Sequence, residues 1–275
     1  EARFLRAWYY FLLLRTYGGI PILGDRVYDV ADNFDLARSS YADCVNYIVS
    51  ELDAAKESLP TDGQTLNSDY GRITSGACLG LKSRVLLYAA SPLFNGGQFA
   101  TSGEIREVTG YASYDAERWK IAADAAKAVM NTGEYALYTK PNGRGFYEFF
   151  IKGDLRSEGA KNEIILPGTR NYYGGTNNRD LEYVGLPPSR SSTYLFTVTQ
   201  NAVDRFPMAN GKDITDATSG YDPQDPYKDR DPRFYNSIIH NGSTWRANTQ
   251  KQEPVWTYVG ATFSSRGTDA VGGDN

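Results

Sequence analysis

The sequence predicts a mainly α-helical protein, with a helical scaffold over residues 1–133 and a large loop-rich part over residues 134–275 that contains a few short strands. Two observations predict this division. Up to about residue 133, apolar residues recur at spacings of three and four, the period of one helix face. From about residue 140, Gly, Asn, Pro and Tyr are abundant and apolar stretches are short. We expect the second part to pack on the first within one domain.

The first helix is predicted over residues 2–17, with Gly18, Gly19 and Pro21 after it as stop signals. Apolar residues lie nearly all around this helix, so we expect it to be buried between neighbouring helices. These residues are Phe4, Leu5, Trp8, Tyr9, Tyr10, Phe11, Leu12, Leu13 and Leu14.

Three further helices are predicted over residues 41–58, 75–90 and 115–131. The helix over residues 41–58, the second of the chain, starts with a capping box of Ser40 and Asp43. Successive helices with similar apolar faces suggest stacked hairpins, the arrangement of a tetratricopeptide-like scaffold. The helix starts are too unevenly spaced for regular repeats of about 34 residues. Trp8 and Trp119 are expected in the core. The inward face of the second helix is predicted to be Tyr41, Cys44, Val45, Ile48, Leu52, Ala55 and Leu59.

The two cysteines, Cys44 and Cys78, lie near the starts of consecutive helices. If these helices are antiparallel, the two residues are roughly 20 Å apart, too far for a disulfide. We predict two free, buried thiols.

The second half offers only short candidate strands, over residues 162–168, 234–239 and 254–260, with an Asn-Gly turn at 241–242. Asp229, Arg230, Asp231 and Arg233 form a run of alternating charges. We interpret it as Arg-carboxylate pairs that lock a long loop, with a charged binding site as the alternative. Loops this long are often binding surfaces.

Composition excludes some classes of protein. The net charge is −4 and no basic stripe is present to meet the phosphates of a nucleic acid. No apolar run approaches the roughly 18 residues of a membrane span. Tyrosine is abundant, with 21 residues, and its flat face and hydroxyl suit binding surfaces. The chain begins within a helical pattern and ends in a Gly-rich tail, so we expect both ends to be cut from a longer protein.

Common catalytic motifs are absent from the sequence: there is no GxSxG, P-loop, GxGxxG after a strand, or HExxH. His240 is the only histidine, and we interpret it as a surface or turn residue. We predict no catalytic residue, no metal ligand and no cofactor. A glycoside hydrolase stays open as an alternative, because it needs only two suitably spaced carboxylates among the 33 acidic residues.

Three stretches of the sequence resemble the SusD/RagB family of outer-membrane nutrient-binding lipoproteins. The first helix, with EARFLRA and YFLLLRTYGGIP, is similar to the family's early helix; GRIT and LKSRVLLYAASPLFNGG resemble its characteristic helix and loop over residues 71–97. The third stretch is the most particular. Its matching residues are Asn210, Gly211, Lys212, Gly220, Tyr221, Asp222, Asp225, Pro226, Tyr227, Arg230, Asp231, Pro232, Arg233, Phe234, Asn241, Gly242 and Trp245.

This resemblance implies a non-catalytic, lipid-anchored protein on the extracellular face of the outer membrane. It would capture oligosaccharides, or sometimes peptides, and deliver them to a SusC-like TonB-dependent transporter. The signal peptide, lipidated cysteine and helical C-terminal region of the family are not in this sequence, and neither Cys44 nor Cys78 is the lipid site.

Sugar rings stack on aromatic side chains while amides and charged groups hold their hydroxyls. Aromatic and amide residues of the second half are therefore the predicted ligand-binding residues. They are Tyr172, Tyr173, Asn177, Asn178, Trp245, Trp256 and Tyr258. A purely structural tetratricopeptide-like scaffold that binds a helical partner is the remaining alternative.

Overall fold

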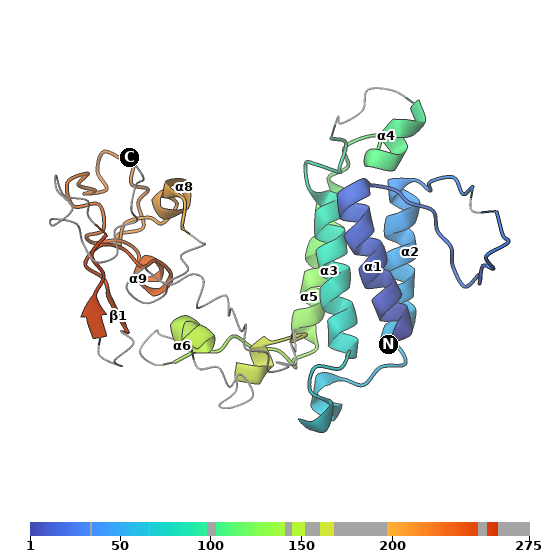
Figure 1. Ribbon diagram of the computed structural model, residues 1–275, viewed down its shortest axis with the longest axis horizontal. Coiled ribbons are helices and arrows are strands. Elements are labelled where there is room, and N and C mark those ends of the chain that lie inside the picture. Colours follow the sequence, from blue (N-terminus) through green and yellow to red (C-terminus); the bar gives the residue numbers. More distant parts are fainter. Residues whose placement is uncertain are drawn as a thin grey trace. The chain divides into compact units, whose positions relative to one another are not determined.

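The structure of the chain is a computed structural model that describes residues 1–33, 35–65, 67–97, 103–140, 145–151, 160–167, 197–246 and 252–257. The chain divides into two compact units, Glu1–Arg170 and Asn171–Asn275 (Figure 1). The first unit is a helical bundle, and the described part of the second is mostly turns with short helices and one hairpin. The described part of the protein is therefore mainly helical with very little strand, as the sequence predicts.

Four long helices form the first unit: α1 (Ala2–Tyr17), α2 (Tyr41–Lys56), α3 (Ser75–Ala90) and α5 (Glu117–Asn131). In this order each packs against the next. The shorter elements are α4 (Gly103–Thr109), α6 (Gly145–Ile151) and the 3-10 turns η1 (Asp62–Gln64), η2 (Asn67–Asp69) and η3 (Ala160–Glu163).

The four predicted helices are confirmed, with small shifts at two ends. The second helix ends at Lys56 rather than residue 58. The last begins at Glu117, because the side chain of Asn95 binds the backbone of Asp115 on both sides, accepting from its N–H at 2.9 Å and donating to its carbonyl at 2.8 Å. Ser40 caps α2 as predicted, since its Oγ accepts from the backbone N–H of Asp43 at 3.0 Å.

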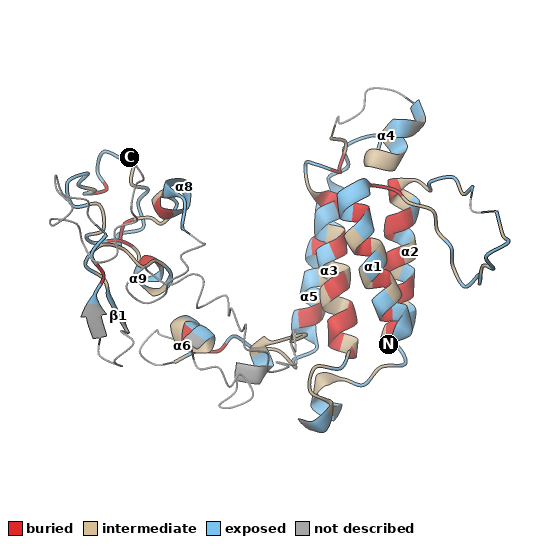
Figure 2. Ribbon diagram, viewed as in Figure 1, coloured by how far each residue is buried: buried red, intermediate tan, exposed pale blue. Residues whose placement is uncertain are grey.

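The core lies where α1, α2 and α3 meet (Figure 2). The predicted inward face of α2 is buried along its whole length, except that Leu59, beyond its end, is only partly buried. Tyr41 is stacked on Phe94 with ring centroids 4.7 Å apart, which ties the start of α2 to the loop after α3. Cys44 and Cys78 are both buried and free, as predicted.

Two predictions about burial are wrong. Among the long helices α1 packs against α2 and α3, and part of its surface is exposed: Leu5 is 46% exposed, Tyr9 62% and Leu13 44%. Trp119, expected in the core, is 39% exposed. It lies on α5, which among the long helices packs against α3. The helices α1 and α5 are the first and last of the four packed long helices, so other long helices cover each of them on one side only.

Two glycines on α3 allow later segments to cross the helix closely. A Cβ atom at Gly76 would lie 1.9 Å from the hydroxyl oxygen of Tyr135, and a Cβ at Gly80 would lie 3.2 Å from Cγ2 of Ile165. Because these glycines are four residues apart, they lie on one face of the helix. The segments around residues 135 and 165 pack on this face.

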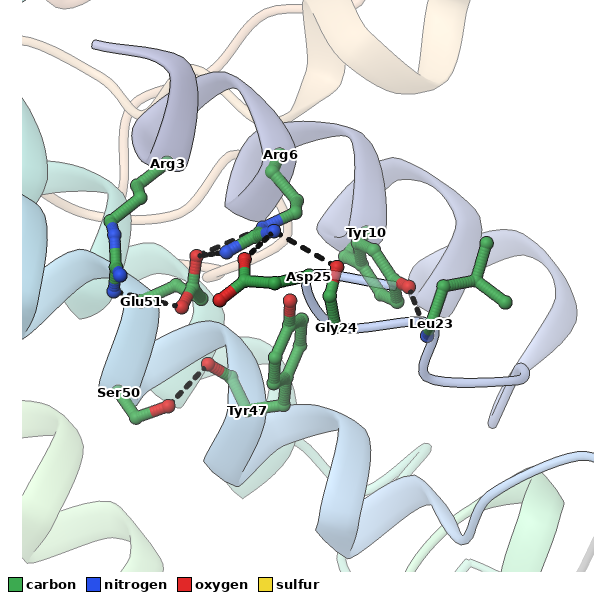
Figure 3. A network of polar contacts seen from close by, with 9 residues as sticks. All are labelled: Arg3, Arg6, Tyr10, Leu23, Gly24, Asp25, Tyr47, Ser50 and Glu51. Carbon is green, nitrogen blue, oxygen red and sulfur yellow. Dashed lines mark hydrogen bonds and ion pairs between the residues drawn. The ribbon is translucent and has the colours of Figure 1, made fainter. Parts of the chain in front are cut away.

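A network of polar contacts holds the loop after α1 against the bundle (Figure 3). The guanidinium of Arg6 donates to Glu51 on α2, to Asp25 at 2.6 Å and to the carbonyl of Gly24 at 2.9 Å. Glu51 is only 7% exposed and also pairs with Arg3. The hydrogen bond from Arg6 lowers the pKa of Asp25. This cluster has no sequence signature, because its members come from three separate segments.

The described second unit contains α8 (Gln200–Asp204), α9 (Pro232–Ser237) and the strands β1 (Thr244–Arg246) and β2 (Gln252–Pro254). The strands are antiparallel, with Trp245 opposite Glu253.

The three predicted strands are not formed as expected. Most of residues 234–239 lies in α9, because Asp231 accepts from the backbone N–H of Arg233 at 2.8 Å and Pro232 occupies the first turn, both signals for a helix start. Residues 160–163 form a 3-10 turn and 164–167 are irregular. Within the described part of the third stretch, Pro254 is in a strand and residues 255–257 are irregular, while residues 258–260 lie outside the described residues. Turn and cap chemistry outweighs the short apolar pattern in the first case.

Candidate ligand-binding unit

The second unit is built around Arg230, the largest fully buried side chain of the described residues. Its guanidinium donates to the carbonyl of Pro226 at 2.8 Å, of Val203 at 2.8 Å and of Phe206 at 2.6 Å. Val203 lies at the C-terminal end of α8 and Phe206 follows it, where the helix carries a partial negative charge. Arg230 therefore ties the helix end to the loop that precedes α9.

This arrangement differs from the predicted lock of Arg-carboxylate pairs. Within the described ranges, Arg230 pairs with no carboxylate, and its Nε has no hydrogen-bond partner. Arg233 does form the expected pair: its Nε and Nη2 donate to the two carboxylate oxygens of Asp231 at 2.9 and 2.8 Å. This contact and the cap together hold the pKa of Asp231 down at about 2. One arginine is thus a buried carbonyl binder and the other a surface ion-pair partner.

The loop between α8 and α9 is held by side chains that bind their own backbone. Asp213 accepts from the N–H and hydroxyl of Thr215 at 2.9 and 2.8 Å, and Asp216 does the same with Thr218 at 2.7 Å for both. These hydrogen bonds lower the pKa of both aspartates. Asn210 donates across the loop to the carbonyl of Ser219 at 2.9 Å. Such turns fix a backbone that few apolar side chains cover.

Aromatic rings surround Phe234, which is fully buried on α9. The ring of His240 stacks on Phe234 at 5.3 Å between centroids and lies 4.6 Å from that of Tyr227. Its Nδ1 lies 2.9 Å from the carbonyl oxygen of Asn241, so this nitrogen donates to the turn. His240 thus has the turn role expected from the sequence and a packing role that the sequence did not indicate. Within the described residues, no group of three or more His, Cys, Asp or Glu is placed to hold a metal ion.

Most of the predicted ligand-binding residues lie outside the part of the second unit that the structure describes. Tyr172, Tyr173, Asn177, Asn178 and Tyr258 lie outside the described residues. The backbone of Trp245 belongs to β1, but its side chain is not among those described. Trp256 is 42% exposed and follows Val255, which is fully buried. Backbone hydrogen bonds from Gly242 to Val255 and from Val255 to Ser243 hold Trp256 at the surface beside the turn at 241–242.

The fold and this unit define a class of protein that combines a helical bundle and a loop-built unit stabilised by polar turns in one chain. Family comparisons agree with both parts. Residues 162–272 match the model of the SusD family, and residues 1–87 match a model described as starch-binding and associating with the outer membrane. The chain belongs to the SusD/RagB family.

Solved structures support the fold assignment. A SusD-like protein from Bacteroides fragilis is 24% identical with a TM-score of 0.66, over 98% of this chain and 48% of that protein. A SusD-like carbohydrate-binding protein from the same organism is 23% identical with a TM-score of 0.63, over 90% of this chain and 41% of that protein. The chain thus spans about half the length of these relatives or less. Among curated proteins, no match to this chain was found.

No helix in the described part of the chain is long and apolar enough to cross a membrane.

Proposed function

We propose that this protein binds glycans without catalysing a reaction, and that loop aromatics of the second unit make the contacts. The observation that supports the proposal is that charged residues of this unit hold its own loops together. Arg230 of the family motif binds backbone carbonyls, and Asp231 of the motif pairs with Arg233. Because these side chains hold the loop, we expect other residues to contact the ligand. Among these, Trp256 presents a partly exposed indole.

The proposed ligand contacts are the aromatic and amide residues of the second unit named above. A flat ring buries the apolar C–H face of a sugar, and amides hold its hydroxyls. The similarity to a SusD-like carbohydrate-binding protein supports an oligosaccharide over a peptide as the ligand. A peptide is the second candidate, and glycoside hydrolysis is a less favoured one.

The family assignment further supports a place for this function in nutrient uptake. We propose that the full-length protein is lipid-anchored on the extracellular face of the outer membrane. There it would pass its ligand to a SusC-like TonB-dependent transporter. Co-purification of the two proteins from outer membranes would test this partnership, and a protein that purifies without any transporter would contradict it.

A glycan screen tests the binding function. Binding of one class of oligosaccharide is expected, without release of new reducing ends. Replacing Tyr172, Tyr173, Trp245 and Trp256 with Ala, one at a time, should weaken binding by about 1–3 kcal/mol, or roughly five- to 150-fold, where the residue is a contact. The melting temperature should stay unchanged where the residue is a ligand contact, because a ring that stacks on a sugar contributes little to a hydrophobic core.

Two controls separate binding from folding. Tyr17, a 64% exposed tyrosine of the first unit, should tolerate change to Ala without loss of binding. Phe234→Ala should lower the melting temperature, because it leaves a cavity in the buried aromatic cluster. If all four loop variants behave like Phe234→Ala, or if glycans bind after all four changes in a folded protein, the proposed contacts are wrong. New reducing ends would indicate a hydrolase instead.

A further inference from the structure

A pocket of about 290 Å³ lies in the first unit, between α1, α3 and the segment that follows η3. This volume is close to the lower end of small-molecule sites, which are about 300 to 1,000 Å³. Its lining combines one aromatic ring, four aliphatic side chains, one glycine and two opposite charges. The residues that carry the argument are Trp8, Leu81, Arg84, Glu163, Ile165 and Leu166.

The pocket is shaped by the close crossing at Gly80. Since this residue has no side chain, Ile165 approaches α3 closely, and the segment 163–166 forms one wall. Leu81 is buried beneath it, and Trp8 is half-buried on α1. The apolar surfaces thus come from both helices and the crossing segment.

Two charged groups in the pocket have unused hydrogen-bonding capacity. Arg84 is exposed, and within the described ranges it forms neither an ion pair nor a hydrogen bond. The carboxylate of Glu163 accepts from the backbone N–H of Tyr138 at 2.5 Å through Oε2. This bond fixes the side chain and leaves Oε1 as an acceptor. The pocket therefore places the guanidinium donors of Arg84 and the carboxylate oxygen Oε1 of Glu163 beside the indole of Trp8.

We propose that this pocket binds a single neutral sugar ring, as a site separate from the loop aromatics of the second unit. The two charges cancel, so a ligand with one net charge would gain one partner and face one repulsion. A sugar ring has an apolar C–H face for Trp8 and hydroxyls at its edge that accept from Arg84 and donate to Glu163. A free aliphatic amino acid could meet both charges but has no flat apolar face to place on the indole.

Saturation-transfer NMR on the 275-residue chain tests this site, with the methyl glycosides of glucose, galactose and mannose as probes. Binding of at least one glycoside is expected with a Kd on the order of 1–10 mM, because few atoms make contact. Arg84→Ala should weaken it by about tenfold, as expected for loss of a charge-assisted hydrogen bond. Arg84 is exposed, so the variant should fold normally.

Arg15→Ala is the matched control, since Arg15 is also exposed, lies on α1 and has no polar side-chain contact within the described ranges. It should leave the Kd unchanged. A protein that lacks all four loop aromatics should still bind the glycoside, which distinguishes this site from the proposed oligosaccharide site. The inference is overturned if no glycoside binds at tens of millimolar, if Arg84→Ala and Arg15→Ala behave alike, or if amino acids bind and sugars do not.

Discussion

The two units of this protein are stabilised by different forces. In the first unit, apolar faces of α1, α2 and α3 pack into one continuous core, with residues such as Ile48 and Leu52 almost completely buried. In the described part of the second, the buried apolar side chains are few: Val203, Met208, Phe234 and Val255. Its loops are held instead by hydrogen bonds from side chains to backbone, centred on Arg230.

This difference indicates which residues of a loop-built unit are most sensitive to substitution. Apolar burial is spread over many contacts, so a helical core tolerates a change at one position in proportion to the volume lost. A buried hydrogen-bond hub concentrates its effect in one side chain. Removing it leaves several acceptors without partners, and each unsatisfied buried group costs about 1–3 kcal/mol.

The largest effect is therefore expected at Arg230. Arg230→Ala should destabilise the second unit by about 2–6 kcal/mol, because the carbonyls of Pro226 and Phe206 lose their donor and each unsatisfied buried acceptor costs about 1–3 kcal/mol. Arg230→Lys should recover only part of this, because one ammonium group cannot reproduce the planar fork that reaches Val203, Phe206 and Pro226. Urea unfolding followed by Trp fluorescence measures the change. If Arg230→Ala unfolds like the unmodified protein, the polar hub is not what holds this unit.

The corresponding change in the first unit is Ile48→Ala. Ile48 is fully buried on α2, so the variant should lose about 2–5 kcal/mol through lost burial and a cavity. Ile121→Ala on α5 is the control, because this side chain is 45% exposed and should cost about 1 kcal/mol or less. Unfolding monitored by circular dichroism at 222 nm, in the range where helices absorb, measures both. Equal losses in the two variants would contradict the assigned core.

A third prediction concerns the close crossing on α3. Gly76→Ala puts a Cβ against Tyr135 and should destabilise the first unit by about 1–2 kcal/mol, after the gain of roughly 1 kcal/mol in helix propensity is subtracted from the strain. Gly80→Ala meets only the end of Ile165 and should change stability by about 0.5 kcal/mol or less. Thermal unfolding of both variants measures the difference. If Gly76→Ala is the more stable of the two, the segment around Tyr135 does not pack as described.

The smallest effect is expected from pH. The folded pKa of Asp231 is depressed to about 2, below its usual unfolded value of about 3.9. The carboxylate therefore contributes stability above about pH 4, and this contribution is lost as pH falls through about 2. Asp231→Asn removes the charge and should flatten this part of the stability curve of the second unit. Melting temperatures from pH 5 to pH 2 measure it, and identical curves for both proteins would contradict the role of the pair with Arg233.

The helical unit could be predicted closely because its signals are local. Ser40, the apolar spacing of α2 and the glycines after α1 each act within a few residues. Burial of α1 and Trp119 was overestimated, because an apolar helix face does not reveal whether a neighbour covers it. The strand expected at 234–239 was lost to the helix start at Asp231 and Pro232, which is also a local signal.

The candidate site could be predicted only in part. The sequence identified a charged, turn-rich loop, and the Arg233–Asp231 pair is two residues apart and therefore visible in the pattern. It could not reveal that Arg230 binds carbonyls 24 and 27 residues earlier, because backbone acceptors have no sequence signature. Of the predicted ligand contacts, only Trp256 has a described side chain, and the assignment of the others remains a prediction.

The reach of Arg230 has a consequence for how the second unit folds. Its contact with Val203 joins positions 27 residues apart, so it closes a loop much as a disulfide does. This closure needs no oxidant, and reducing agents do not cut it. It does need the end of α8 to be in place, because Val203 belongs to that helix and Phe206 follows it. Helix and loop should therefore be gained and lost together, as a single cooperative step.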